Sequence, residues 1–242
     1  MHYQWDFQLL LRYAPLFWKG VAVTLLYTAW SVSLGLLLGL LIGLGRLAKP
    51  RVDVLRAMPP RRWLLSGNFW LWPVQWLLVA FVEMFRCTPL LVQIVWVYYA
   101  LPVLIGVQIP AAIAAVLTLS FYTGAFYAEI FRGGIVSIER GQWDAARALG
   151  LAPWTMMRQV ILPQAIRRMV PPFVNQSITQ LKNTSLVSTI AVPDLLYNGT
   201  LITADTYRPL EVYTVIAIIY FILLFPSTML AQRYEKQLQV NR

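Results

Sequence analysis

Of the chain's 242 residues, 59% are hydrophobic and only 12% are charged, whereas a soluble domain carries about a quarter charged residues. The single cysteine (Cys87) excludes an intrachain disulfide, and the single histidine (His2) argues against a histidine-based metal site or a Ser-His-Asp triad. The formal net charge is +10, but the basic residues alternate with apolar runs, so we read them as signals of membrane orientation rather than of nucleic-acid binding. The composition indicates an all-α integral membrane protein.

The first candidate span, 21–45, contains no charged residue and is long enough to cross about 30 Å of hydrocarbon. Small residues recur in it every fourth position, which predicts a face for close packing of another helix. These residues are Ser31, Gly35, Gly39 and Gly43. The preceding 20 residues show no cleavable signal pattern and form either an amphipathic surface helix or a capping segment.

Four further spans are predicted, at 88–105, 110–131, 174–192 and 211–230. Residues 69–87 are interpreted as an interfacial approach to the second span. The alternative, one long helix from Val74, would place Glu83 and Arg86 in the membrane at a considerable cost in free energy.

The distribution of basic residues predicts the orientation of these spans. The segments 46–62 and 132–168 and the carboxyl-terminal tail hold 15 of the 20 Lys and Arg residues. Because short cytoplasmic segments are enriched in Lys and Arg, we expect the amino terminus outside and the carboxyl terminus in the cytoplasm.

The segment 137–163 has the composition of two short helices. Asp144 to Leu149 has high helix propensity, and Gly150 is suited to ending a helix. Pro153 can open a second helix at its first position, and we expect Pro163 to close it. Two short helices that meet at an angle would form a compact projection able to enter a groove on a partner.

This segment resembles the "EAA" coupling loop of ABC importer permeases. The matching residues are Asp144, Ala145, Ala146, Gly150, Ile161, Leu162 and Pro163, with Asp144 in place of the usual glutamate. Four other stretches, 85–93, 123–135, 182–190 and 207–214, resemble the polar amino-acid branch of that family. The resemblance implies a type I ABC importer permease fold in one domain, 1–242, with a coupling loop at 137–163.

The same resemblance implies the partners and the location. It implies a dimer of ABC ATPase subunits, a second permease chain that is identical or homologous, and a periplasmic or extracellular substrate-binding protein. ATP and Mg would be bound by the ATPase, because this chain has no phosphate-binding Gly-Lys pair and so no cofactor of its own. The chain would lie in the bacterial cytoplasmic (inner) membrane and import a polar amino acid, with Asp144, Ala145, Ala146, Gly150 and Pro163 coupling it to the ATPase.

The unusually polar span 174–192 is the predicted substrate pathway, since polar side chains are costly in lipid. Lys182 either lines the pathway, pairs with an acid such as Glu129, or snorkels. Pro89 either breaks a helix beside a ligand or simply starts one. The candidate pathway residues are Lys182, Asn183, Thr184, Ser185, Thr179, Thr88, Gln93, Tyr122 and Thr123.

Two other classes of protein were weighed. An ion-coupled secondary transporter of small polar solutes should carry acidic residues deep in several spans, whereas the acids here lie at span ends. A membrane-embedded enzyme would need a catalytic set of side chains, which this sequence does not offer. The identity of the amino acid, the composition of the permease dimer and the role of the long first cytoplasmic loop do not follow from the sequence.

Overall fold

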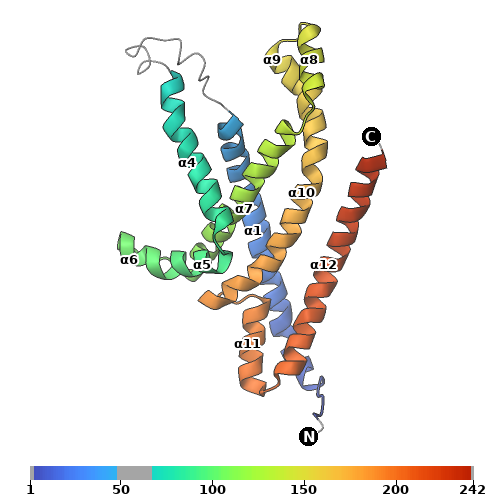
Figure 1. The fold of residues 1–242 in the computed structure, drawn as a ribbon. Helices are drawn as coiled ribbons and strands as arrows, with labels where there is room; N and C mark the ends of the chain where they lie inside the picture. The colour runs from blue at the N-terminus through green and yellow to red at the C-terminus, as the bar shows by residue number, and fades with distance from the viewer. Residues whose placement is uncertain (1–2, 48–66, 241–242) are drawn as a thin grey trace. The chain divides into compact units, whose positions relative to one another are not determined.

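The computed structural model describes residues 3–47 and 67–240, and in these ranges the regular secondary structure is entirely helical, without a β-strand (Figure 1). The predicted all-α class is confirmed. Most of the predicted basic loop, 46–62, lies outside the described residues.

The longest helices are α1 (Ala14–Leu47), α4 (Gly67–Cys87), α7 (Ala111–Val136), α10 (Leu162–Asn183) and α12 (Pro209–Val240). The shorter ones are α5 (Leu90–Val95), α6 (Leu101–Ile105), α8 (Arg140–Ala148), α9 (Pro153–Met156) and α11 (Leu195–Thr206). The 3-10 helices Leu9–Tyr13 and η4 (Thr184–Ile190) and the π-helical turns Trp96–Ala100 and Met157–Ile161 lie between them.

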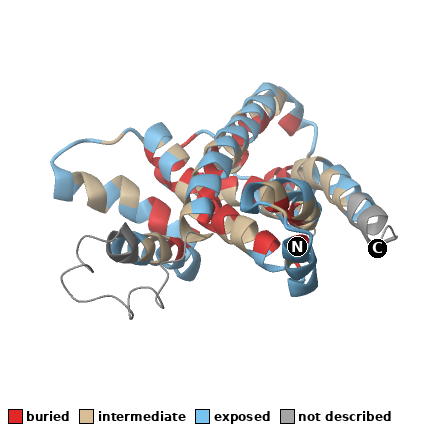
Figure 2. Cartoon of the chain, turned by 90° about the horizontal axis from the view of Figure 1, so that it is seen from above, coloured by how far each residue is buried: buried red, intermediate tan, exposed pale blue. Residues whose placement is uncertain are grey.

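Three helical stretches are long and apolar enough to cross a membrane: Leu9–Leu47, Ala111–Val136 and Pro209–Arg233. A fourth is added if the bent pair Pro73–Cys87 and Leu90–Ile105 counts as one span. Only 6% of the apolar window of α12 is buried, and Figure 2 shows the buried positions as narrow strips on helices that are otherwise exposed or intermediate. Apolar and exposed helices of this kind are expected of a chain surrounded by lipid.

The described residues form two compact units. Unit 1 comprises Met1–Ser33, Pro89–Ser120 and Val174–Arg242, and unit 2 comprises Leu34–Thr88 and Phe121–Phe173. The core of unit 1 joins the start of α1 to α11 and α12. Its buried residues are Leu10, Phe17, Val21, Leu195, Ile202, Val212 and Ile216.

In unit 2, the glycine stripe of α1 packs directly against α7, as predicted. A Cβ atom added at Gly39 would lie 2.5 Å from the Cβ of Tyr127, and one added at Gly35 would lie 2.8 Å from the Cβ of Thr123. Distances this short leave no room for a side chain, so glycine permits the contact between the two helices.

The predicted second span, 88–105, falls on the helical segments from Leu90 to Ile105. Residues 67–87, interpreted as an approach to this span, form a continuous helix of 21 residues. The break falls at Pro89, whose ψ of 133° is extended, and α5 begins at Leu90. A proline disfavours the helical conformation of the residue before it, which explains why α4 ends before Thr88.

The predicted end of the second short helix at Pro163 is wrong. From Pro153 the chain stays helical through α9, the π-helical turn and α10 to Asn183, and Pro163 lies in the first turn of α10. The π-helical turn Met157–Ile161 ends directly before α10, and Leu162 N–H donates to the carbonyl of Met157. A widened turn relieves the clash between a proline ring and the preceding turn, so the helix continues.

Candidate functional site

The coupling segment is a short helix with a well-defined stop. Gly150 adopts a left-handed conformation with φ of 70°, its N–H donates to Arg147 O at 2.9 Å, and Leu151 N–H donates to Ala146 O at 3.2 Å. These two hydrogen bonds define a Schellman motif, for which glycine is the preferred residue. The predicted helix end at Gly150 is confirmed.

One face of α8 anchors the segment to the rest of unit 2. Ala146 is 2% exposed and belongs to a core cluster that includes Ile161, Ala165 and Met169 of α10 and its preceding turn. Gln164 Nε2 also donates to Gln142 Oε1 at 3.1 Å, which ties α8 to α10. The base of the segment is therefore fixed.

The opposite side of the segment is open. Asp144, Ala145 and Gly150 are exposed, and Asp144 pairs with Arg147 of its own helix. Two large apolar side chains of the segment are also exposed, Leu149 at 78% and Trp154 at 73%. Neither was predicted from the sequence, because exposure depends on which side of α8 packs against the rest of unit 2.

The hydroxyl groups of the polar stretch 179–189 bond mostly to their own helix. Thr184 donates to Leu181 O at 2.7 Å, and Ser185 donates to Lys182 O at 2.8 Å. Thr179 donates to the carbonyl four residues before it. These groups are satisfied without water, so their polarity alone does not require an aqueous pathway.

Lys182 and the amides differ from the hydroxyl groups. Lys182 is exposed, and within the described part of unit 1 no carboxylate pairs with it. Gln180 is fully buried and donates to Ser31 Oγ at 3.2 Å. The side-chain Nδ2 of Asn183 is buried without a hydrogen-bond partner among the described residues. Gln93 is buried on α5, which packs against η4.

The remaining pathway candidates belong to unit 2. Thr88 is exposed at the end of α4 and donates to Met84 O at 2.6 Å. Thr123 is fully buried where α7 meets Gly35, while its neighbour Tyr122 is half-buried. The structure therefore places Thr123 in a helix contact rather than on an open surface of the unit.

Glu129 is the centre of an arginine cluster in unit 2. Arg46 of α1 pairs with its Oε1, Arg132 Nη2 lies 2.8 Å from its Oε2, and Arg86 Nη1 lies 3.9 Å from Oε1. Arg86 Nη1 also lies 3.6 Å from Glu83 Oε1, the pair predicted from their i, i+3 spacing. Because three arginines already engage Glu129, this acid is a poor structural partner for Lys182.

A buried acid that the sequence analysis did not single out lies in unit 1. Asp194 is 1% exposed and caps α11, accepting a hydrogen bond from Tyr197 N at 2.8 Å. Its Oδ2 has no hydrogen-bond partner among the described residues. Burial raises the pKa of this carboxyl to about 6, against the lowering effect of the backbone donors. An aspartate directly before an apolar helix was a recognisable capping signal.

Residues 64–239 match the family described as "Binding-protein-dependent transport system inner membrane component". The chain belongs to this family. It is thus a membrane-spanning permease subunit of an ATP-driven importer, and its location is a membrane that it crosses several times. The family assignment favours this function over the ion-coupled alternative.

Two relatives show the branch of the family. The chain is 34% identical over 238 residues to the glutamine transport system permease protein GlnP of Escherichia coli K12, covering 98% of this chain and 99% of that one. It is 32% identical over 236 residues to the arginine transport system permease protein ArtQ of Bacillus subtilis, covering 98% of each. These permeases confirm the predicted resemblance to the polar amino-acid branch.

Solved structures agree with the fold. A crystal structure of an amino acid ABC transporter with histidines has a TM-score of 0.83 and 34% identity, covering 97% of this chain and all of that one. An inward-facing structure of the MetNI methionine ABC transporter has a TM-score of 0.68 at 22% identity, covering 93% of this chain and 97% of that one, and supports the fold alone. The predicted type I importer permease fold is confirmed.

Proposed function

We propose that this chain imports a polar amino acid across the bacterial cytoplasmic membrane and is driven by a separate ATPase that binds the coupling segment 137–163. The observation that carries the proposal is the build of that segment, with Ala146 buried in the core and Asp144, Ala145 and Gly150 exposed. A segment that transmits force from a partner needs one side packed against its own protein and another side exposed to the partner. The named substrates of the relatives, glutamine and arginine, support a polar amino acid as cargo.

The complete assembly would contain two ATPase subunits, a second permease chain that is identical or homologous, and a periplasmic or extracellular binding protein. ATP and Mg would be bound by the ATPase alone. The amino terminus would lie outside and the tail in the cytoplasm, in keeping with the basic residues of 132–168.

The route of coupling follows the helix that leaves the segment. From Pro153 to Asn183 the backbone is continuously helical, so a displacement at the tip can be carried along α10 toward Lys182 and Asn183. Pro171 and Pro172 interrupt the hydrogen bonds of this helix and provide a point at which it can bend. Alternating access would use two positions of this helix, one for each nucleotide state.

Leu149 and Trp154 would anchor the ATPase contact. Large apolar side chains that are exposed on a protein surface are typical of the centre of an interface, where aromatic residues contribute most. The surrounding charges, including the exposed pair Asp144 and Arg147, would form its rim.

The test is a bulky substitution at the exposed tip. Ala145→Trp should prevent co-purification of the ATPase and abolish substrate-stimulated ATP hydrolysis while membrane insertion stays normal. The matched control is Ala204→Trp, at an exposed position of α11, which should co-purify the ATPase at the parental yield. Parental co-purification and hydrolysis in Ala145→Trp would refute the coupling role.

Reconstituted vesicles test the energy source and the cargo. With the ATPase and binding protein present, uptake of labelled glutamine or arginine should require ATP inside the vesicle or on the ATPase side. Uptake driven by an ion gradient without ATP would contradict the proposal and favour the secondary transporter.

A further inference from the structure

The segment before α1 presents a row of aromatic rings. Residues 3–7 are not helical, and alternate side chains lie on the same side: the ring centroids of Tyr3 and Trp5 are 5.4 Å apart, and those of Trp5 and Phe7 are 5.5 Å apart. All three side chains are exposed. The residues between them, Gln4 and Asp6, are polar. The segment is amphipathic with the period of an extended chain rather than of the surface helix considered from the sequence.

The segment is fastened to the start of α12 by its backbone and by the Tyr3 hydroxyl. Glu211 is fully buried, and its carboxylate accepts hydrogen bonds from Tyr3 Oη and from Asp6 N, the latter at 3.1 Å. Arg208 Nη1 lies 3.2 Å from Glu211 Oε1 and donates to Gln4 O at 2.7 Å. Glu211 and Arg208 are thus paired with each other, and the guanidinium carbon of Arg208 lies 5.8 Å from the centroid of the Tyr3 ring.

These contacts also fix the depth of the rings. Glu211 lies in the first turn of the apolar stretch Pro209–Arg233, where α12 enters the hydrocarbon. Trp18, at the start of α1, and Tyr207, in the turn before α12, are 72% and 87% exposed. Figure 1 shows that the start of α1 and the turn between α11 and α12 lie at the same end of unit 1. Tryptophan and tyrosine are enriched at this level, where one part of the ring is apolar and the other is hydrated.

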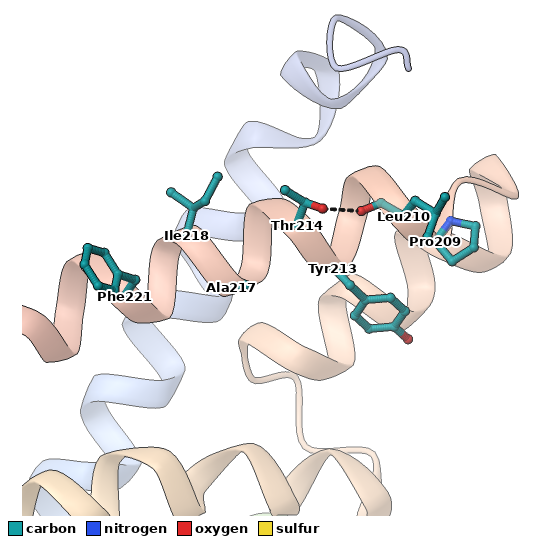
Figure 3. A pocket seen from close by; sticks show the side chains of 7 residues that line it. All are labelled: Pro209, Leu210, Tyr213, Thr214, Ala217, Ile218 and Phe221. Carbon is teal, nitrogen blue, oxygen red and sulfur yellow. Dashed lines mark hydrogen bonds between the residues drawn. The ribbon is translucent and has the colours of Figure 1, made fainter. Parts of the chain in front are cut away.

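The same unit carries a second apolar surface. The first turns of α12 carry a shallow hollow on their exposed side, drawn in Figure 3. Its lining is apolar except for the hydroxyls of Tyr213 and Thr214, and the Thr214 hydroxyl donates to Leu210 O at 2.6 Å. A surface of this composition at the depth of helix entry is covered by lipid whenever the protein is in a bilayer, whereas a protein partner would leave it exposed on dissociation.

We propose that Tyr3, Trp5 and Phe7 form an interfacial anchor that inserts into the boundary between the headgroups and the acyl chains of the bilayer. The partner is the lipid surface, and Glu211 and Arg208 are positioning residues that hold the anchor against unit 1. The anchor fixes the depth of the start of α1 and of the turn between α11 and α12.

The test uses nitroxide labels on the assembled transporter in vesicles of phosphatidylethanolamine and phosphatidylglycerol. Trp5→Cys and Phe7→Cys, each in a Cys87→Ser background, are labelled singly, with Gln4→Cys as the matched control on the polar side. Oxygen should relax the labels at positions 5 and 7 more than a water-soluble nickel complex does, and the order should reverse at position 4.

Two results would overturn the proposal. If positions 5 and 7 are as accessible to the nickel complex as position 4, the rings lie in water. If they are shielded from both relaxing agents, a protein covers them, as expected of a docking site for the binding protein. Co-purification of the ATPase shows in each case that the labelled variant has assembled.

Discussion

Replacing Asp194 by asparagine should stabilise the protein at neutral pH and remove part of its pH dependence. The pKa of this carboxyl is raised from 3.8 to about 6 by burial, so the folded state holds the proton more tightly than the unfolded state. Folding therefore takes up a proton between these two values, and the contribution of Asp194 to stability falls as the pH rises through this window. Above about pH 6 the full cost of about 3 kcal/mol is present.

Asparagine isolates this cost because it caps helices as well as aspartate does and has nearly the same shape. The groups that face Asp194 in unit 1 are the backbone N–H of Tyr197, from which it accepts a hydrogen bond, and the hydroxyl of Tyr220, which has no hydrogen-bond partner among the described residues. The advantage of Asp194→Asn over the parent should grow between pH 5 and pH 7.5, by on the order of 1 kcal/mol.

The assay is thermal or chemical unfolding of the purified complex across pH 5 to 7.5, comparing the parent with Asp194→Asn and Asp194→Ala. The alanine variant loses the cap as well as the charge, so it should lie about 1 kcal/mol below the asparagine variant at each pH. A difference between parent and Asp194→Asn that does not change with pH would show that the carboxyl is ionised at the same pH in both states. Burial would then not raise the pKa of Asp194 in the folded protein.

Three further substitutions test the packing, the arginine cluster and the pathway. Gly39→Ala should lower the melting temperature and yield, because its Cβ would meet α7 at 2.5 Å, whereas Gly133→Ala, with nothing within 4 Å, should be neutral or slightly stabilising. Glu129→Gln should destabilise the purified protein by about 1.5–3 kcal/mol in denaturant unfolding by leaving the mostly covered Arg46 without its carboxylate, while Glu139→Gln, on an exposed and distant pair, should change little. Lys182→Met should keep the parental melting temperature, because no carboxylate of the described unit 1 loses a partner, and should depress uptake in vesicles. Parental uptake would leave snorkelling as the role of Lys182.

The local features that could be predicted were those in which one residue type has a single structural use. Gly150 is left-handed at the end of α8, and the stripe from Gly35 to Gly43 packs on α7, because no other residue fits either position without strain or collision. The coupling segment could be located from the helix stop at Gly150 together with its resemblance to the EAA loop. Its exposed anchors could not be located, because exposure depends on which side of α8 packs against α10.

The pathway was harder to predict because polarity in a span has two possible causes. Thr184 and Ser185 looked costly in lipid, yet each hydroxyl returns to a carbonyl three residues earlier. The buried amides of Gln180 and Asn183 cannot satisfy all of their donors and acceptors in this way, since a side-chain amide has two donors and a carbonyl. Amides in a span are therefore better indicators of a tertiary or ligand contact than hydroxyls are, and only a structure shows which atoms stay unpaired.

The misplaced helix stop at Pro163 has a physical cause. A proline commonly ends a helix, because it removes a hydrogen bond and its ring clashes with the preceding turn. A widened turn accommodates the ring, so the chain continues as a helix. Both π-helical turns of the described chain end two residues before a proline, at Pro102 and Pro163. Pro89 differs because its own ψ is extended, and there the helix does break. This difference joins the coupling segment to α10 in one continuous helix, so the predicted stop at Pro163 concealed the connection on which the proposed coupling mechanism depends.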